Sequence, residues 1–114
     1  MTTFIEGGVT AAKGFQAAGV HCGIRKNRAK KDLGLIVSDR PASAAAVYTR
    51  NLVKGAPLTV TQAHIADGRA RAIVCNSGIA NTCAFDGIEK AEAMCALTAE
   101  ALGIDAADVV VAST

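Results

Sequence analysis

The sequence predicts an α/β fold organised around a β-α-β unit. Ala70–Cys75 is an apolar run centred on Ile73 and Val74, which is typical of a buried strand. A stretch with helical periodicity follows it, and Val109–Ala112 is a second apolar run of strand length. A strand, a helix and a strand in this order indicate a helix packed on one face of a sheet. The sequence leaves open whether the two strands are neighbours.

The helix between these strands has expected start and stop signals. Asp86 stands three residues before Glu89, which resembles a capping box with Asp in place of Ser or Thr. Gly103 is a typical helix end. The helix is expected to bury one apolar face, formed by Ile88, Ala91, Cys95 and Leu102 with Met94 beside them.

A hairpin is predicted nearer the N-terminus. Gly19–Ile24 and Leu33–Ser38 are its expected strands, and a basic turn around Asn27 connects them. The five basic side chains of this turn either bind a phosphate-bearing partner or face solvent. They are Arg25, Lys26, Arg28, Lys30 and Lys31.

The segment between the hairpin and the β-α-β unit contains weaker signals. Ala44–Thr49 is expected to be a third strand, with Pro41 marking the connection before it. Pro57–Thr61 suits either a half-exposed strand or the start of a helix. Asp67-Gly68 predicts a turn.

Composition narrows the functional classes. The chain has 114 residues with 51% hydrophobic and 19% charged side chains, which argues against a disordered protein. A net charge of +2 gives no argument for nucleic-acid binding. The apolar residues are mostly Ala and Val, with three Phe and no Trp, so we expect a thin core that packs against another chain or segment.

The loop after Ala70–Cys75 is the main candidate site. It contains Asn76, Ser77, Gly78 and Asn81 at the C-terminal end of a strand, where α/β proteins often place ligand contacts. Its backbone amides are suited to holding an anion. The alternative is an ordinary turn, because Asn and Ser readily hydrogen-bond to their own backbone.

Other reactive side chains give weak signals. The four cysteines contain no CxxC pair and the two histidines lie far apart, so neither a metal site nor another cofactor is predicted. Cys22, Cys75 and Cys95 lie in apolar stretches, where buried thiols are common. His21 is expected to be a packed or surface residue rather than a catalytic base. No Ser-His-Asp triad is proposed.

Two features concern the protein's context. Free thiols, no signal peptide and no membrane-spanning stretch lead us to expect a cytoplasmic protein. The last apolar run leads directly into Ala112-Ser113-Thr114 with no turn after it. We therefore expect the chain to be part of a larger protein.

The chain contains five motifs in this order: Gly8-Val9-Thr10-Ala11-Ala12-Lys13-Gly14-Phe15, Ala18-Gly19-Val20, Lys31–Asp39, Asn76–Asn81 and Val110–Thr114. Together they resemble the N-terminal part of the ornithine acetyltransferase family, the bifunctional glutamate N-acetyltransferases of arginine biosynthesis. The loop after the buried strand resembles the family's Asn-Ser-Gly-Asn-Ala-Asn, with Ile79 in place of Asn, and the last strand resembles one that continues into Gly-Val-Ile-Gly.

The resemblance implies a layered αββα sandwich of the ornithine acetyltransferase and self-cleaving aminopeptidase kind, incomplete in this chain, which would be a single segment, 1–114, of the first subunit. In the family a precursor cuts itself between Ala and Thr. The freed Thr begins the β subunit and carries acetyl from N-acetylornithine to glutamate, and some members also use acetyl-CoA. Thr114 corresponds to the family's oxyanion-hole Thr, and the partnering Gly would follow it.

The resemblance also implies partners. The nucleophile-bearing β subunit and the rest of the α subunit would complete the enzyme, as a heterotetramer of two α and two β subunits. The sequence departs from the family in lacking the Asn-Met-Ala-Thr-Met-Leu processing site, so the chain alone is expected to be inactive. Two alternatives remain, namely a piece of a related self-cleaving aminopeptidase and a stand-alone anion-binding module.

Overall fold

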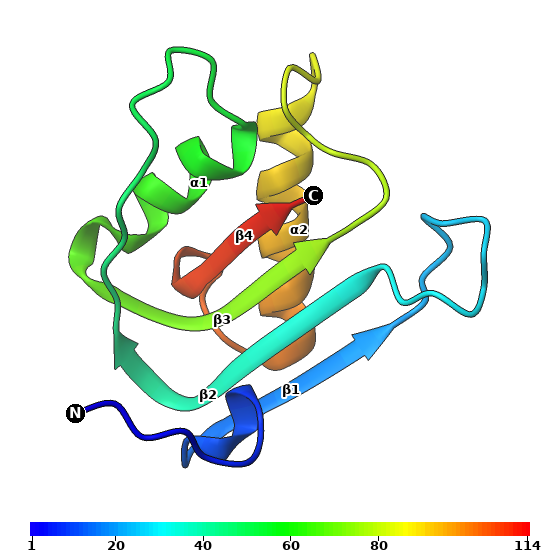
Figure 1. Ribbon diagram of the computed structural model, residues 1–114. Helices are drawn as coiled ribbons and strands as arrows, with labels where there is room; N and C mark the ends of the chain where they lie inside the picture. The colour runs from blue at the N-terminus through cyan, green and yellow to red at the C-terminus, as the bar shows by residue number, and fades with distance from the viewer.

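A computed structural model describes residues 1–114 and contains one four-stranded sheet. The strands are β1 (Phe15–Val20), β2 (Leu33–Ser43), β3 (Arg69–Asn76) and β4 (Val109–Ser113), and they lie in chain order across the sheet (Figure 1). β1 and β2 are antiparallel, as are β2 and β3, whereas β3 and β4 are parallel. The α/β class predicted from the sequence is confirmed.

The β-α-β unit is formed by β3, the helix α2 (Gly87–Leu102) and β4. Its two strands are immediate neighbours, which the sequence had left open. Gly103 ends α2 in the left-handed region at φ 67°, as predicted. The predicted capping box does not form. Asp86 is the N-cap residue, but its carboxylate makes no capping bond and instead lies 2.9 Å from the Lys90 ammonium.

The core is built from small side chains, as expected. Only 13 of the 114 residues are buried, and the apolar ones among them are Val, Ala and Cys. α2 contributes Ala91, Cys95 and Ala99 to this core, and Met94 and Leu102 pack against it. Ile88 was wrongly placed on the buried face, because it is 49% exposed. The buried stripe follows a spacing of four residues, starting from Gly87 in place of Ile88.

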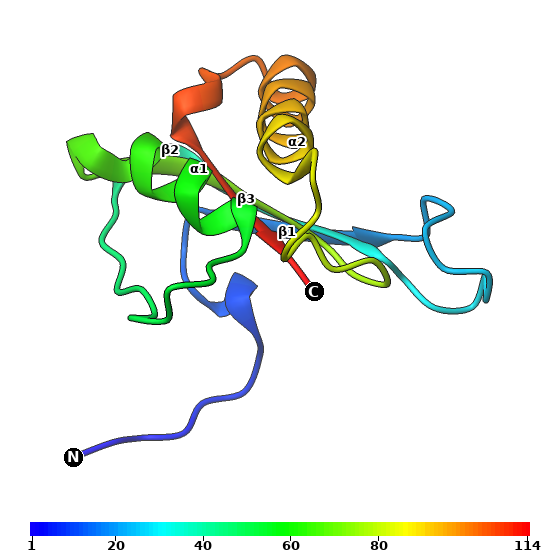
Figure 2. The same ribbon diagram turned by 90° about the horizontal axis from the view of Figure 1, so that it is seen from above.

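The helix α1 (Ala56–His64) decides the ambiguity at Pro57–Thr61 in favour of a helix. Proline suits the first turn, where its missing N–H is not needed. A short 3₁₀ helix (Ile65–Asp67) follows, and Gly68, at φ 73°, makes the predicted turn into β3. α1 lies along the outer edge of β4, whereas α2 covers one face of the sheet (Figure 2).

The hairpin of β1 and β2 is confirmed, but its first strand was misplaced. The strand runs over Phe15–Val20 instead of Gly19–Ile24. The chain leaves the sheet after Val20 because the carboxylate of Asp32 accepts hydrogen bonds from the backbone amides of Cys22 and Arg25, at 2.7 and 2.8 Å. These contacts turn residues 21–25 into a loop.

The third expected strand, Ala44–Thr49, is absent. β2 continues as far as Ser43, which pairs with Arg69 at the start of β3. The Ala44 amide still donates to the Gly68 carbonyl at 2.8 Å. β3 begins at Arg69 and β1 pairs with β2 only as far as Ser38, so residues 44–49 have no strand to pair with and lead towards α1. A strand needs such a neighbour, and apolar composition alone cannot supply one.

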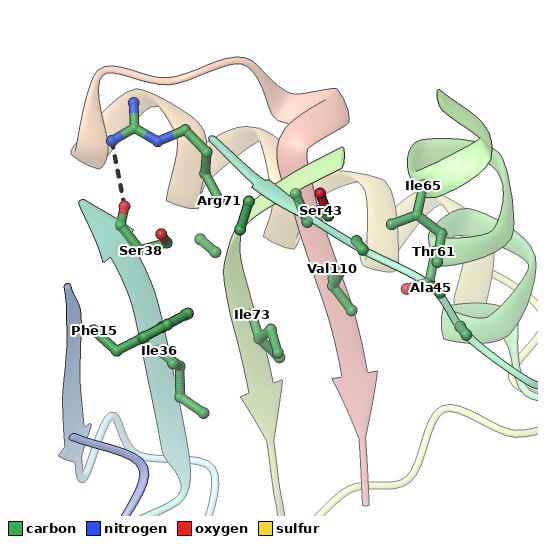
Figure 3. Close-up of a pocket in the computed structure, with 15 residues that line it drawn as sticks. Phe15, Ile36, Ser38, Ser43, Ala45, Thr61, Ile65, Arg71, Ile73 and Val110 are labelled. Carbon is green, nitrogen blue, oxygen red and sulfur yellow. Dashed lines mark hydrogen bonds between the residues drawn. The ribbon is translucent and has the colours of Figure 1, made fainter. Parts of the chain in front are cut away.

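A bulge divides β2 between Val37 and Ala42. Arg71 of β3 stabilises this bulge, because its guanidinium donates to the carbonyls of Ser38 and Asp39 at 3.3 and 2.9 Å. Figure 3 shows this arginine at the end of a cavity of about 260 Å³ on the sheet face opposite α2.

That opposite face is apolar and uncovered. Ile36, Ile73 and Val110 are aligned across β2, β3 and β4, and their side chains lie on the same side as Phe15 (Figure 3). Ile73 and Phe15 are 41% and 38% exposed. The chain thus provides one helical layer and one sheet layer, and its second sheet face has no layer packed on it.

Candidate functional site

Thr114 and the loop Asn76–Asn81 lie side by side at one end of the sheet. β3 and β4 are parallel with Asn76 opposite Ser113, so the segments that follow both strands meet at their C-terminal ends. The Thr114 amide donates to the Asn76 carbonyl at 3.0 Å, and the Gly78 amide donates to the Thr114 carbonyl at 3.0 Å. The structure therefore brings together residues that the sequence singled out separately.

Gly78 is required by the conformation of this loop. Its φ is 104°, a backbone conformation that residues other than glycine rarely adopt. A Cβ atom at this position would also lie 2.9 Å from Cγ of Arg25. The loop is thus in close contact with the basic hairpin turn.

Side chains of the site close the loop on itself. Asn76 Nδ2 and Ser113 Oγ both donate to the Ile79 carbonyl, at 3.0 and 3.2 Å. The Ser77 amide donates to the Asp32 carbonyl at 2.8 Å. Because the amides of Ser77 and Gly78 are both bound to protein carbonyls, they are not directed at an external anion. These two amides therefore act as they would in an ordinary turn.

Asn81 has a different role from the rest of the loop. Its Nδ2 donates to the carbonyl of Gly87 at 3.1 Å, so it fastens the loop to the first turn of α2. Its Oδ1 is buried without a hydrogen-bond partner. A cavity of about 280 Å³ lies beside Asn81 and the end of β4, and Asn51 and Lys54 supply further polar groups to its wall.

Asp32 is the residue at this site that the sequence did not single out. It is 2% exposed, and the two backbone amide donors, Cys22 and Arg25, hold the pKa of its carboxyl well below the usual range. The only sequence signal is its position at the end of a polar turn, just before an apolar strand, where Asp commonly binds backbone amides.

His21 lies against the same carboxylate. Its Nδ1 is 3.2 Å from Oδ2 of Asp32 and 3.0 Å from the Lys30 carbonyl. These contacts close the hairpin turn, so the structure places His21 in a packing role, as expected.

Most of the basic run faces solvent. Lys26, Arg28, Lys30 and Lys31 are exposed. Arg25 is the exception, because it is half-buried and its Nε donates to Oγ of Ser77 at 3.2 Å. One cation of the run therefore contacts the candidate site directly.

The cysteines are all unpaired thiols. Cys95 is buried, and Cys75 is half-buried on β3, but Cys22 is exposed, contrary to the burial suggested by its sequence context. No three His, Cys, Asp or Glu side chains lie together as potential metal ligands. None of the helices is long and apolar enough to cross a bilayer.

Comparisons of this sequence with known proteins all find members of one family. The profile of the ArgJ family matches residues 16–114. The arginine biosynthesis bifunctional protein ArgJ of Halalkalibacterium halodurans is 51% identical over 95% of this chain, and that of Geobacillus kaustophilus is 47% identical over the whole chain. This chain spans 26% and 28% of the lengths of these two relatives.

Two solved structures have the same fold over 94% of this chain. The crystal structure of ArgJ from Bacillus halodurans matches with a TM-score of 0.87 and 47% identity, and 56% of that chain is covered. The ornithine acetyltransferase of Mycobacterium tuberculosis, solved with ornithine, matches with a TM-score of 0.85 and 40% identity over 59% of its chain. The sheet and helices of this chain are thus an arrangement that it shares with both solved structures. The chain belongs to the ArgJ family.

Proposed function

We propose that this chain is the N-terminal segment, residues 1–114, of the α subunit of a cytoplasmic ArgJ enzyme that transfers acetyl from N-acetylornithine to glutamate. The observation that carries the proposal is the position of Thr114, at the end of β4 and bonded to Asn76 and Gly78, in a chain of this family. The relatives' names place them in arginine biosynthesis, and one structural relative is named as an ornithine acetyltransferase in complex with ornithine.

The proposed reaction has two steps, with a Thr of the β subunit as nucleophile. Its hydroxyl attacks the acetyl carbonyl of N-acetylornithine, the amide C–N bond breaks, and ornithine leaves after its amine takes up the proton. The amine of glutamate then attacks the acetyl-threonine ester, which forms N-acetylglutamate and returns the proton to the Thr hydroxyl. An N-terminal Thr suits this role because its own amine can act as the base.

In this scheme Thr114 stabilises the negative oxygen that develops in both steps. Its backbone amide already donates to the Asn76 carbonyl, so its hydroxyl is the group left to donate to an oxyanion. The amide of the Gly that follows this Thr in the family would be the second donor. Continuing the alternation of β4 one residue past Ser113 would put the Thr114 side chain on the face of Val110 and Ala112, which is the uncovered face of the sheet.

The uncovered face is where we place the missing layer of the αββα sandwich, built from the rest of the α subunit and the β subunit. Two coverage values support a two-chain enzyme. Nearly the same share of this chain spans 26% of a curated ArgJ sequence but 56% of a crystallised ArgJ chain, so the crystallised chain is about half as long as the curated one. We propose the assembly of two α and two β subunits on the family resemblance.

The test is an assay of the full-length ArgJ protein that carries this segment. With N-acetylornithine and isotopically labelled glutamate, we expect labelled N-acetylglutamate, and mass spectrometry of the quenched enzyme should find acetyl on the N-terminal Thr of the β subunit. The 114-residue chain alone should show no turnover. A full-length protein that processes itself yet transfers no acetyl from N-acetylornithine would contradict the proposal.

We also propose that the enzyme accepts acetyl from a second donor, acetyl-CoA. The relatives are named bifunctional, which favours acetyl-CoA as an additional donor here. Replacing N-acetylornithine with acetyl-CoA in the same assay tests this. Formation of N-acetylglutamate supports the second activity, and its absence restricts the enzyme to exchange between ornithine and glutamate.

A further inference from the structure

One buried acidic residue links the hairpin turn to the proposed oxyanion site. The carboxylate of Asp32 has no exposed surface, and its two oxygens accept the backbone amides of Cys22 and Arg25 at 2.7 and 2.8 Å. The carbonyl of the same residue accepts the Ser77 amide at 2.8 Å. Asp32 therefore makes contacts in two directions, one to the turn and one to the loop after β3.

Arg25 completes the link. The bond from its amide to Asp32 fixes its backbone, and its Nε donates to Oγ of Ser77. The absence of a side chain at Gly78 lets Cγ of Arg25 approach this loop closely. Two contacts, from the Asp32 carbonyl and from the Arg25 side chain, thus hold Ser77 in place.

The next contact reaches Thr114. Gly78 follows Ser77 directly, and its amide donates to the carbonyl of Thr114 at 3.0 Å. The peptide group that links Thr114 to a following residue includes this carbonyl. In the proposed oxyanion hole, the orientation of that peptide sets the direction of the second donor.

We propose that Asp32 is a positioning residue for Thr114 and the peptide after it, acting through Arg25, Ser77 and Gly78. The inference rests on the proposed function, and it assigns Asp32 no contact with substrate. Oxyanion stabilisation depends on donors held rigidly at the right distance, so a shift of this loop should weaken the transition state more than substrate binding.

The experiment compares variants of the full-length ArgJ protein that carries this segment. Asp32→Asn keeps the shape but replaces one acceptor oxygen with an NH₂ group that faces a backbone amide. We expect kcat for acetyl transfer to fall by about tenfold or more, with KM little changed, because displacements near 1 Å cost up to about 100-fold. Ser77→Ala removes only the Arg25 contact and should give a smaller loss of kcat.

Hydrogen exchange supplies a readout that is independent of activity. In Asp32→Asn the amides of Ser77 and Gly78 should exchange about tenfold faster or more, while the Val74 amide in the middle of β3 stays protected. Asp105→Asn is the matched control. It also loses a carboxylate that accepts a backbone amide, but this residue is exposed and caps the 3₁₀ helix (Ala106–Asp108) that precedes β4. Thr114 lies at the other end of β4, so kcat and exchange at residues 77 and 78 should stay at wild-type values.

The outcomes separate the two proposals. If the wild-type protein transfers no acetyl, the proposed function fails, and exchange at residues 77 and 78 still decides whether Asp32 positions the loop. Wild-type kcat and exchange in Asp32→Asn would overturn the positioning role, as would a loss of protection spread evenly over the sheet. If Asp32→Asn does not fold, Ser77→Ala decides, and wild-type kcat and exchange in that variant would overturn the role.

Discussion

The hydroxyl of Thr61 forms hydrogen bonds to both backbone groups of Val111. It donates to the Val111 carbonyl at 3.0 Å and accepts from the Val111 amide at 3.1 Å. Val111 lies on β4, at the edge of the sheet, where backbone groups lack a neighbouring strand. One turn later on α1, Nδ1 of His64 lies 2.9 Å from the Val109 carbonyl. α1 thus closes this edge with side chains.

Thr61→Val should destabilise β4. The change keeps the shape of the side chain but leaves a buried amide and a buried carbonyl without partners, which costs about 1–3 kcal/mol. Thermal melting of the full-length protein and hydrogen exchange at Val111 measure the effect. Thr59→Val is the control, because Thr59 is on the same helix but exposed. Equal melting temperatures for the two variants would contradict the closing role of Thr61.

The isolated 114-residue chain should be marginally stable and expose an apolar face. Without the layer that we propose covers this face, Ile73 and Phe15 are exposed and Ile36 and Val110 are only half-buried. We expect strong binding of a hydrophobic dye and a broad thermal transition. Ile73→Gln should reduce dye binding, whereas Thr59→Val should not. A monomer with a sharp, cooperative melt would argue against an uncovered face.

Asp32 should make stability depend on pH in the acid range. Two backbone amides lower the pKa of its carboxyl in the folded state, whereas in the unfolded chain it is about 3.9. The folded state therefore binds this proton less tightly, and the stabilisation is fully present above about pH 4 and lost as the pH falls below it. The stability difference between wild type and Asp32→Asn should shrink on acidification from pH 6 to about pH 3. A constant difference would contradict this account.

The cysteines should differ in reactivity and be dispensable for catalysis. Burial, with a smaller effect of the Glu92 charge, raises the pKa of Cys95 to about 11, so this thiol should resist alkylation in the native protein. Cys22 and Cys83 are exposed, but the hydrogen bond to Asp32 raises the pKa of Cys22, so Cys83 should react first. Mass spectrometry during alkylation gives the order. Single Ala or Ser replacements should leave turnover intact, and a folded, inactive variant would refute this.

The parts of the fold that the sequence predicted well are those with strong local signals. β3 and β4 are apolar runs and α2 ends at a glycine, and all three elements were placed correctly. The errors arose where a distant group decides the local structure. Residues 21–24 are a loop because Asp32 binds the amide of Cys22, and residues 44–49 are no strand because no neighbouring strand reaches them.

In the candidate site, too, local sequence signals were found and contacts between distant residues were missed. Asn76–Asn81 and Thr114 were found because both follow apolar strands, but their contact depends on β3 and β4 being adjacent and parallel. Asp32 was missed because its importance comes from amides seven and ten residues before it and from a loop far along the chain. Only the folded backbone brings these groups together.

Thr114 gives the sharpest test of the proposed chemistry. If its hydroxyl donates to the oxyanion, Thr114→Val in the full-length protein should lower the rate of nucleophile acetylation by about 100-fold or more, because one such donor contributes roughly 3 kcal/mol. Thr114→Ser keeps the hydroxyl and should retain most of the rate. Substrate affinity should change far less than the rate in both variants, since the charge develops only in the transition state.

The backbone contacts of Thr114 separate its two possible donors. Its amide is engaged with Asn76, so a wild-type rate in Thr114→Val would transfer the role to the amide of the next residue, the Gly of the family motif. Replacing that Gly with Pro would then remove the donor and abolish the rate. Single-turnover acetylation of the β-subunit Thr, followed by mass spectrometry, measures each case. Wild-type rates in both variants would remove this end of β4 from the oxyanion hole altogether.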